Sequence, residues 1–499
     1  MITLGIDSGT QSTKTIALDV ETGEILASAS AAYGMIEDLP AGHLEQDPQV
    51  WIDAVDSTIR ECLAKLGSRR EDVKAIGVSG QQHGFVPLDK KGKVIRPAKL
   101  WCDTSTVEQC KQFDDEFDGP EGLIKLAGNA IMPGYTAPKI LWLLQNEPKN
   151  YQALASVLLP HDYINFYLTG ERGMEFGDAS GTGLMDVREK KWCEPLIEFI
   201  DPDLIDCLPP ISSSRRALGL LRENLREAWG LTKSPVISAG GGDNMMGAIG
   251  TGNVQPGVVT VSLGTSGTVY AYASDPVIDP EGEVAAFCDS TNRWLPLVCT
   301  MNVTVATEQV RKMFGWSHEE AERQIASVPA GARGLLFLPY LNGERTPNLP
   351  KGTGILHGLT TENMEPAALA RATMEGVTLG LGYGLGRFRQ LGIQPTEIRL
   401  TGGGSQSPVW RQICADVFNV PTVCLESAEG AALGAAIQGA YASITANGQA
   451  ATFRELCARI VKVDEETRSE PDQDTRDIYT RLLSRQSDLT RRIQAAGYL

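Results

Sequence analysis

The sequence predicts an α/β protein built from two similar domains. Apolar segments typical of strands alternate along the 499-residue chain with longer helical patterns. A chain of this length ordinarily folds into two or more domains. In addition, one strand–turn–strand pattern occurs twice, first near residue 2 and again near residue 257. The repetition suggests an internal duplication in which each half opens with the same hairpin.

Each predicted hairpin has a Gly-Thr turn between two apolar strands. The first hairpin spans residues 2–18 with its polar turn at 7–12, and the second spans residues 257–272 with its turn at 264–267. Glycine and hydroxyl side chains in such turns expose donors that suit a phosphate. Either turn alone is equally consistent with an ordinary hairpin connection. Two such turns facing each other could hold one polyphosphate across a cleft.

Further strands and helices follow in alternation. We expect strands at residues 73–78, 235–239, 335–338 and 398–401, and helices at residues 49–66, 366–387, 408–418, 430–440 and 475–495. The dipeptide Asp47-Pro48 is a start signal for the first of these helices. We place the domain boundary near residues 240–250, which gives one domain at residues 1–243 and a second at residues 244–499.

The composition restricts the class of partner. A net charge of −17 and a pI of about 4.9 argue against nucleic-acid binding, which requires a basic face. The ten cysteines form no Cys-x-x-Cys pair, so zinc and thioredoxin-type sites are not indicated. The opening residues lack the basic region of a signal peptide, and no apolar run is long enough to span a bilayer. We therefore expect a cytoplasmic protein with no membrane partner.

Three glycines followed by an aspartate form the most informative turn. Gly240, Gly241 and Gly242 follow the strand at residues 235–239 and precede Asp243. Glycines let a ligand or another backbone approach closely, and open α/β sheets bind ligands at such strand ends. Asp243 could act there as a general base. The alternative is an ordinary turn in which Asp243 caps the following helix.

Three other loops carry polar groups suited to ligands. In the first hairpin, Lys14 could add a positive charge for phosphates and Asp7 could hold Mg²⁺ through water. Gln82 and His83 lie between glycines after the strand at residues 73–78, and such side chains suit a polyhydroxylated ligand. Trp101 could stack on a sugar. The loop Gly402-Gly403-Gly404 permits a flat nucleobase or ribose to lie on its backbone, or simply connects a strand to a helix.

Taken together, these residues resemble the FGGY carbohydrate kinases along nearly the whole chain. The resemblance rests on residues 5–10, 45–48 with Trp51, 80–84, 100–103, 134–142, 158–163, 178–182, 240–244, 262–267, 338–347 and 402–404. It implies two ribonuclease H-like, actin-like ATPase domains around a central cleft. It also implies ATP-dependent phosphorylation of a small sugar, D-xylulose at its C5 hydroxyl, with ATP and Mg²⁺ as cofactors and with a homodimer as one option.

The resemblance also implies roles for individual residues. Asp243 matches the catalytic base, and Asp7 matches the acidic residue near the phosphates, with Mg²⁺ held by Asp7 through water and by Asp243. The implied sugar contacts are Gln82, His83, Trp101, Asp103 and Asn244. The implied ATP contacts are Thr10, Thr13, Lys14, Thr265, Gly402, Gly403 and Gly404.

One departure and two rival functions remain open from the sequence. The kinases of this kind that act on D-xylulose usually carry methionine where this chain has Gln82, which leaves related ketoses, glycerol and pentitols as alternative substrates. An actin-like or chaperone-like ATPase would keep both hairpins but would have no need of His83 and Trp101. A sensor without catalysis would have no need of Asp7 and Asp243.

Overall fold

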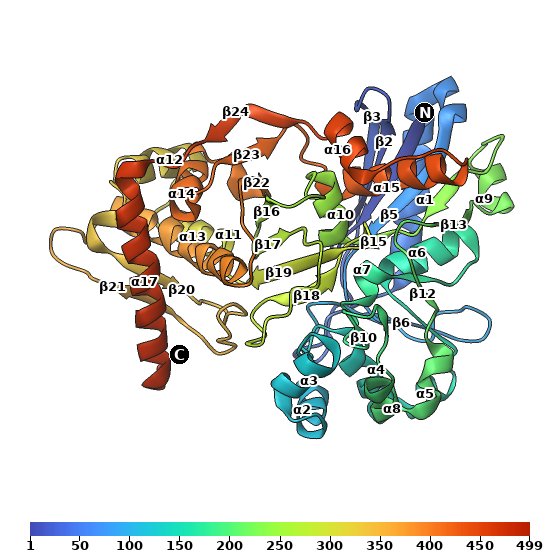
Figure 1. Cartoon of the computed structure of the whole chain (residues 1–499), viewed down its shortest axis with the longest axis horizontal. Coiled ribbons are helices and arrows are strands. Elements are labelled where there is room, and N and C mark those ends of the chain that lie inside the picture. Colours follow the sequence, from blue (N-terminus) through green and yellow to red (C-terminus); the bar gives the residue numbers. More distant parts are fainter.

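Two seven-stranded sheets, one in each half of the chain, form the framework of the molecule (Figure 1). The computed structural model describes residues 1–499. In the first sheet the strand order is β13-β14-β5-β1-β2-β3, and β15 pairs with β5. The bounds are β1 Ile2–Ser8, β2 Ser12–Asp19, β3 Ile25–Ala32, β5 Val73–Gly80, β13 Ala217–Leu220, β14 Val236–Ser238 and β15 Gly241–Gly242.

The second sheet has the order β18-β19-β17-β16-β22-β23-β24. Its bounds are β16 Val258–Leu263, β17 Gly267–Ala271, β18 Ala285–Cys288, β19 Trp294–Thr300, β22 Glu397–Thr401, β23 Thr422–Leu425 and β24 Val463–Ser469. β16 is antiparallel to β17 and parallel to β22, as β1 is antiparallel to β2 and parallel to β5. The two halves therefore share one topology, which confirms the predicted fold class and the predicted duplication.

Helices cover these sheets. Those that frame the site or are discussed below are α1 Pro48–Leu66, α2 Val107–Glu116, α3 Gly119–Ala127, α4 Thr136–Asn146, α6 Pro160–Thr169, α7 Phe176–Ala179, α10 Asp243–Gly250, α13 Pro366–Gln390, α14 Pro408–Phe418, α15 Gly430–Ala446, α16 Phe453–Ile460 and α17 Gln473–Ala495. The others are α5 Pro148–Gln152, α8 Glu194–Ile200, α9 Glu223–Ala228, α11 Thr304–Met313 and α12 His318–Ala326. The expected helices and strands are thus present, with ends shifted by one or a few residues. None of these helices has both the length and the apolar composition needed to cross a bilayer.

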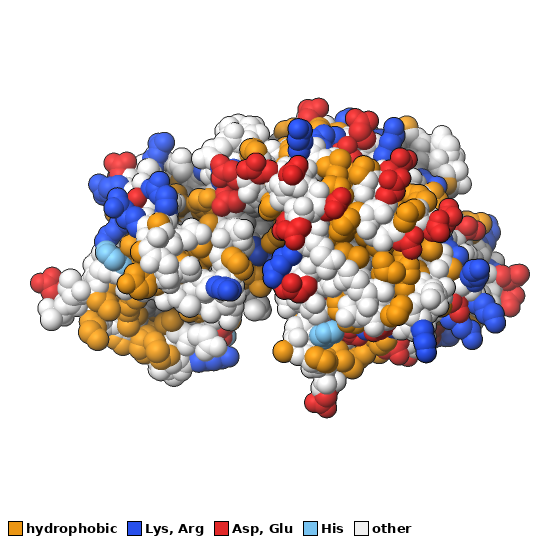
Figure 2. Space-filling model, turned by 90° about the horizontal axis from the view of Figure 1, so that it is seen from below, with side chains coloured by type: hydrophobic (Ala, Val, Ile, Leu, Met, Phe, Trp, Pro, Cys, Tyr) orange, Lys and Arg blue, Asp and Glu red, His pale blue; other side chains and the backbone are white.

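Short strand pairs complete the fold outside the two main sheets. They are β4 Glu45–Gln46 with β7 Ala98–Lys99, β6 Val86–Leu88 with β8 Ser156–Leu158, β9 Met174–Glu175 with β12 Ile211–Ser212, β10 Met185–Asp186 with β11 Lys191–Trp192, and β20 Leu336–Pro339 with β21 Gly354–His357. Seen from below, the space-filling surface shows a notch between the lobe of the first half and the lobe of the second (Figure 2).

Helix α15 belongs to the second half of the sequence but covers the sheet of the first half. Its residues contact β1, β5 and β14, and it also lies along α10. A buried cluster joins Ile16 and Leu18 of β2 to Ile249 of α10 and Ile437 of α15. The division between residues 243 and 244 therefore stays a prediction, and α15 and α16 pack across it.

Strand β1 is longer than the sequence indicates. Asp7 and Ser8, expected in the hairpin turn, continue the strand and pair with β2 on one side and β5 on the other. A strand with a neighbour on each edge forms backbone hydrogen bonds to both neighbours as it is extended. These bonds outweigh the turn preference of Asp and Ser. Asp7 is thereby fixed at the end of a central strand, opposite Lys14 and Ser79.

Candidate active site

Asp243 is the first residue of α10, directly after the three-glycine turn. Gly242 is the N-cap, so Asp243 does not cap the helix, contrary to the alternative that its sequence position allowed. Its Oδ1 accepts hydrogen bonds from the backbone N of Asn244 at 2.7 Å and from Asn244 Nδ2 at 3.0 Å. Its Oδ2 has no hydrogen bond within the protein and is free to accept a proton.

The three glycines are required by close contacts, as predicted. A Cβ on Gly240 would lie 2.9 Å from the carbonyl oxygen of Val78, and the φ of Gly240 is +76°. A Cβ on Gly241 would lie 2.4 Å from Ser290 Oγ, and one on Gly242 would lie 2.6 Å from Gln82 Cγ. These distances are too short for any side chain, so the turn brings Asp243 against β5 only because it lacks side chains.

Two partly buried carboxylates face this region without a full set of counter-charges. Burial and the nearby charge of Asp7 together raise the pKa of Asp243 to about 7, although the hydrogen bonds from Asn244 act in the opposite direction. Burial also raises the pKa of Asp7, which accepts a 2.9 Å hydrogen bond from Ser79 Oγ. Such a raised carboxyl pKa suits a group that must take up a proton near neutral pH.

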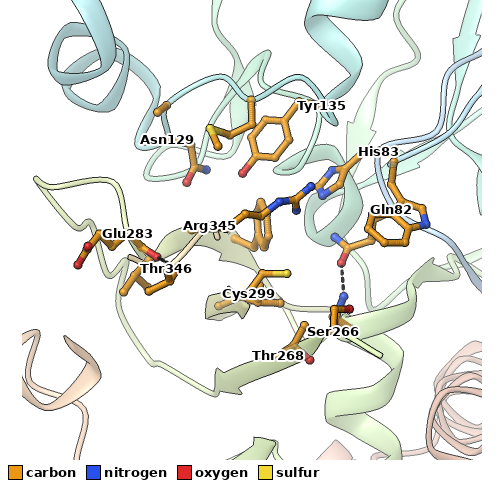
Figure 3. Close-up of a pocket in the computed structure, with 18 of the residues that line it drawn as sticks. Gln82, His83, Asn129, Tyr135, Ser266, Thr268, Glu283, Cys299, Arg345 and Thr346 are labelled. Atoms are coloured by element: carbon orange, nitrogen blue, oxygen red, sulfur yellow. Dashed lines mark hydrogen bonds between the residues drawn. The ribbon is translucent and has the colours of Figure 1, made fainter. Parts of the chain in front are cut away.

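A cavity of about 440 Å³ opens in front of Asp243, between the two halves (Figure 3). Six of the residues predicted from the sequence line it: Gln82, His83, Trp101, Asp243, Asn244 and Thr265. They come from the loop after β5, the segment after β7, the start of α10 and the turn after β16, which are far apart in the sequence. The fold thus brings four of the five predicted sugar residues, the predicted base and the second Gly-Thr turn to one place.

His83 is held as a neutral imidazole. Burial, together with the nearby charges of Lys139 and Arg345, lowers its pKa to about 3. Its Nδ1 lies 2.7 Å from the carbonyl oxygen of Gly181, which can only accept, so Nδ1 carries the proton. The ring stacks on Tyr135 with centroids 4.7 Å apart. Nε2 is left as a hydrogen-bond acceptor, which suits a sugar hydroxyl.

Asp103 lies outside the cavity, in a buried ion cluster. Its carboxylate accepts from Lys99 Nζ at 3.2 Å and from the backbone N of Leu44 at 2.9 Å. His43, Glu45 and Asp103 have the spacing of a metal site, but Lys99 Nζ sits among them, 3.1 Å from both His43 Nδ1 and Glu45 Oε1. The ammonium group supplies the positive charge there. The predicted sugar contact of Asp103 stays a prediction, and any such contact would require Asp103 to leave this cluster.

The two loops of the second half that are predicted to contact ATP lie side by side. Ser262 of β16 pairs with Thr401 of β22, so the turns that follow these strands are neighbours. A Cβ on Gly402 would lie 2.7 Å from the carbonyl oxygen of Leu263, and its φ is +82°, so only glycine fits. Gly403 is exposed and has open space beside it, where a flat group can lie on the backbone.

The predicted ATP residues of the first hairpin have protein partners. Thr10 Oγ1 accepts from Trp101 Nε1 at 3.0 Å, which links this turn to the cavity wall. Thr13 is buried and its hydroxyl donates to Ser8 Oγ at 3.1 Å. Lys14 Nζ pairs with Glu429 Oε1 at 2.8 Å, directly before α15. None of the three lines the cavity, and their contacts with ATP stay predictions.

The sequence did not single out four residues that the cavity contains. Tyr135, Cys299, Asn129 and Arg345 lie around its centre (Figure 3). Asn129 is fully engaged, because its side chain donates to the carbonyl of Ala286 and accepts from the Ala286 N–H. Tyr135 and Arg345 fall within the family motifs at residues 134–142 and 338–347, which was the only signal available for them.

Arg345 crosses the cavity from the second half toward the first (Figure 3). No carboxylate pairs with its guanidinium. Its charge adds to the effect of burial in lowering the pKa of His83, and it opposes the rise that burial causes in the pKa of Cys299. A guanidinium has five N–H donors and no acceptor. An unpaired one inside a cavity therefore indicates a ligand rich in oxygen atoms.

Comparisons with known proteins agree with this geometry. The N-terminal domain of the FGGY family of carbohydrate kinases matches residues 2–250, and its C-terminal domain matches residues 259–443. The xylulose kinase of Haemophilus influenzae is 39% identical over 97% of this chain and 99% of its own length, and that of Escherichia coli is 36% identical over 83% and 84%. A Brucella ovis structure described as a xyloylose kinase superposes with a TM-score of 0.92 at 31% identity, covering 99% of this chain and 100% of that one. The chain belongs to the FGGY family of carbohydrate kinases.

Proposed function

We propose that this kinase transfers the γ-phosphoryl group of ATP to the C5 hydroxyl of D-xylulose, giving D-xylulose 5-phosphate and ADP. The observation that carries the proposal is the free Oδ2 of Asp243, which lies partly buried at the start of α10 in a cavity also lined by Gln82, His83 and Trp101. Relatives named xylulose kinase, matched along nearly their whole length, support the choice of sugar.

Asp243 would act as the general base. As the C5 oxygen attacks the γ-phosphorus, its proton passes to Asp243 Oδ2, and the bond between the γ-phosphorus and the oxygen of ADP breaks. Phosphoryl transfer depends mainly on positioning and on stabilising charge. The N–H and hydroxyl groups of Gly264, Thr265 and Ser266 lie in the same cavity and would stabilise the charge that develops on the phosphate oxygens.

The carboxylates of Asp7 and Asp243 fit a divalent cation. Both are partly buried, the charge of Asp7 adds to the effect of burial in raising the pKa of Asp243, and Lys14, opposite Asp7 in the hairpin, is already paired with Glu429. Mg²⁺ held there would supply positive charge that offsets the charge of the phosphate groups. We propose that Asp7 holds this ion through water and that Asp243 lies beside it.

Arg345 gives a prediction about sugar binding. Replacing Arg345 by alanine removes the unpaired guanidinium from the cavity, so we expect the KM for D-xylulose to rise about 10- to 100-fold, the loss expected for a hydrogen bond to a charged group. The KM for ATP should change little. Steady-state kinetics in both substrates measures this, with Arg333→Ala as the control, because Arg333 pairs with Glu365 on the surface of the second half. A rise confined to the KM for ATP would contradict the placement.

The function is tested by a coupled ADP-release assay. It uses ATP, Mg²⁺ and a panel of D-xylulose, D-ribulose, L-ribulose, L-fuculose, L-rhamnulose, glycerol and pentitols, with a control that lacks sugar. We expect strong release with D-xylulose alone and weak release without sugar, because water is a poor acceptor in a cleft that closes around the sugar. Selective release with another sugar would keep the kinase and refute the substrate. Release that is independent of sugar would favour an ATPase.

A further inference from the structure

Gln82 lies at the centre of a buried chain of polar groups. Asn244 Nδ2 donates to Gln82 Oε1 at 2.8 Å and to Asp243 Oδ1 at 3.0 Å. On the other side of Gln82 lies Asp178, whose Oδ2 accepts from His161 Nδ1 at 2.8 Å. Gln82 is 4% exposed and Asp178 and His161 are 0% exposed. The chain therefore runs from a buried histidine, through Gln82, to the proposed base.

The amide of Gln82 faces Asp178 with its nitrogen. Gln82 Nε2 and Asp178 Oδ1 are both buried, and neither has another hydrogen-bond partner. A Cβ on Gly242 would lie 3.0 Å from Gln82 Cδ and 3.1 Å from Asp178 Oδ1, so the two groups lie around the same point of the turn. Burial raises the pKa of Asp178, and hydrogen bonds from His161 and from Gln82 act against that rise. We infer that Gln82 Nε2 donates to Asp178 Oδ1.

The carboxylates at the two ends fix the direction of every hydrogen bond between them. An ionised carboxylate only accepts, so Asn244 must turn its NH₂ toward Asp243 and Gln82 must turn its NH₂ toward Asp178. Gln82 Oε1 then receives the second hydrogen of Asn244 Nδ2. Asn244 Oδ1 is left without a protein partner, and Asn244 lines the cavity. No flipped arrangement of either amide satisfies both ends.

His161 anchors the far end of the chain. It is held between Asp178 and Asp162, whose Oδ1 lies 2.9 Å from His161 Nε2, and these two carboxylates raise its pKa well above the usual value. The charged imidazole compensates Asp178, which would otherwise be a buried unpaired charge. A Cβ on Gly80 would lie 2.8 Å from the backbone N of His161, so α6 sits directly on the end of β5. Asp178 is thus rigidly placed.

We propose that Gln82 is a positioning residue: held by the Asp178–His161 pair, it orients the Asn244 amide so that Asp243 keeps Oδ2 toward the sugar hydroxyl. This proposal rests on the proposed function and deepens it. It differs from the role implied by the family resemblance, in which Gln82 contacts the sugar. The oxygen of the Gln82 amide already accepts from Asn244, and its nitrogen faces Asp178, so both ends of the side chain are held by protein groups.

The two roles predict different kinetic changes for Gln82→Met. Methionine, which related kinases usually carry here, has a similar length and keeps the packing beside Gly242. In this chain, however, it releases the Asn244 amide and leaves Asp178 Oδ1 without a donor. A positioning role predicts that kcat falls about 10- to 100-fold, the loss typical of a misplaced catalytic group, while the KM values for D-xylulose and ATP stay within about threefold. Isothermal titration should then give a Kd for D-xylulose close to that of the unmodified protein. A sugar-contact role predicts the opposite split.

Two further variants keep the test decisive. Gln109→Met is the matched control, because Gln109 is also a buried glutamine, bonded to Gln145, but lies on α2 outside the cavity. It should leave kcat unchanged. Asp178→Asn keeps an oxygen that can accept from Gln82 Nε2, so this variant should retain more of kcat than Asp178→Leu. The double variant Asp178→Leu with Gln82→Met should be no slower than Gln82→Met alone, because both changes break the same chain of hydrogen bonds. Thermal melting of each variant confirms that it is folded.

The outcomes separate this proposal from the proposed function. If the unmodified protein has no turnover with D-xylulose, both fail. If it is active and Gln82→Met keeps its kcat, or raises the Kd for D-xylulose tenfold with kcat intact, the positioning role alone is overturned. A fall in kcat with unchanged Kd, absent from Gln109→Met, supports it.

Discussion

Asp243→Asn should reduce kcat by about 10²- to 10⁴-fold, the typical contribution of a general base. The variant keeps the shape of the side chain at the start of α10, but an amide cannot take the proton of the C5 hydroxyl at Oδ2. ATP should still bind, because the glycine-rich loops at residues 264–267 and 402–404 are untouched. The coupled assay measures kcat, and titration with a non-hydrolysable ATP analogue measures binding.

A second buried aspartate provides the control for this variant. Asp416 on α14 is 6% exposed and accepts hydrogen bonds from Gln412 Nε2 and from the backbone N of Asp472, far from the cavity. Asp416→Asn should leave turnover close to that of the unmodified protein. If a folded Asp243→Asn protein turned over D-xylulose at a near-normal rate, the assignment of the base would be wrong.

The fold could be predicted because its signals are local and repeated. The two hairpins, with their Gly-Thr turns, are visible in the sequence as apolar strands separated by glycine and threonine, and they indicate the duplication without any contact information. The packing of α15 on the first sheet could not be predicted in this way. Apolar residues such as Ile437 indicate that this helix is buried, but they do not indicate which of the two sheets it covers.

The site was predicted where a residue sits on a recognisable turn. Asp243 and His83 follow strand ends, so the sequence indicates both their place and their chemistry. Arg345 lies in a long connection of the second half, and only the folded chain brings it beside Tyr135 and Cys299. The sugar contact of Asp103, which the family resemblance implies, stays a prediction; its contact with Lys99 could not be predicted from the sequence.

Gly434→Ala should destabilise the protein strongly, because α15 touches α10 backbone to backbone. A Cβ on Gly434 would lie 1.8 Å from the carbonyl oxygen of Met246, and one on Gly250 would lie 1.7 Å from the carbonyl oxygen of Gly430. A methyl group cannot be accommodated unless the two helices separate, which also opens the core cluster that they share with β2. We expect a loss of about 3 kcal/mol or more in the free energy of unfolding, at the upper end of overpacking effects.

Gly386→Ala is the control that separates the effect of the contact between α10 and α15 from the general effect of replacing a glycine inside a helix. Gly386 lies inside α13, and a Cβ there would have nothing within 4 Å, so alanine should stabilise this helix by roughly 0.5–1 kcal/mol through its better helix propensity. Differential scanning calorimetry should therefore show a lower Tm for Gly434→Ala and an equal or higher Tm for Gly386→Ala. The Gly434 variant should also lose kcat at temperatures where it is folded, because α10 carries Asp243 at its first residue and moves when α15 is pushed away. An unchanged Tm in Gly434→Ala would mean that α10 and α15 are not in this contact. The position of Asp243, the proposed base, would then depend on other contacts of α10.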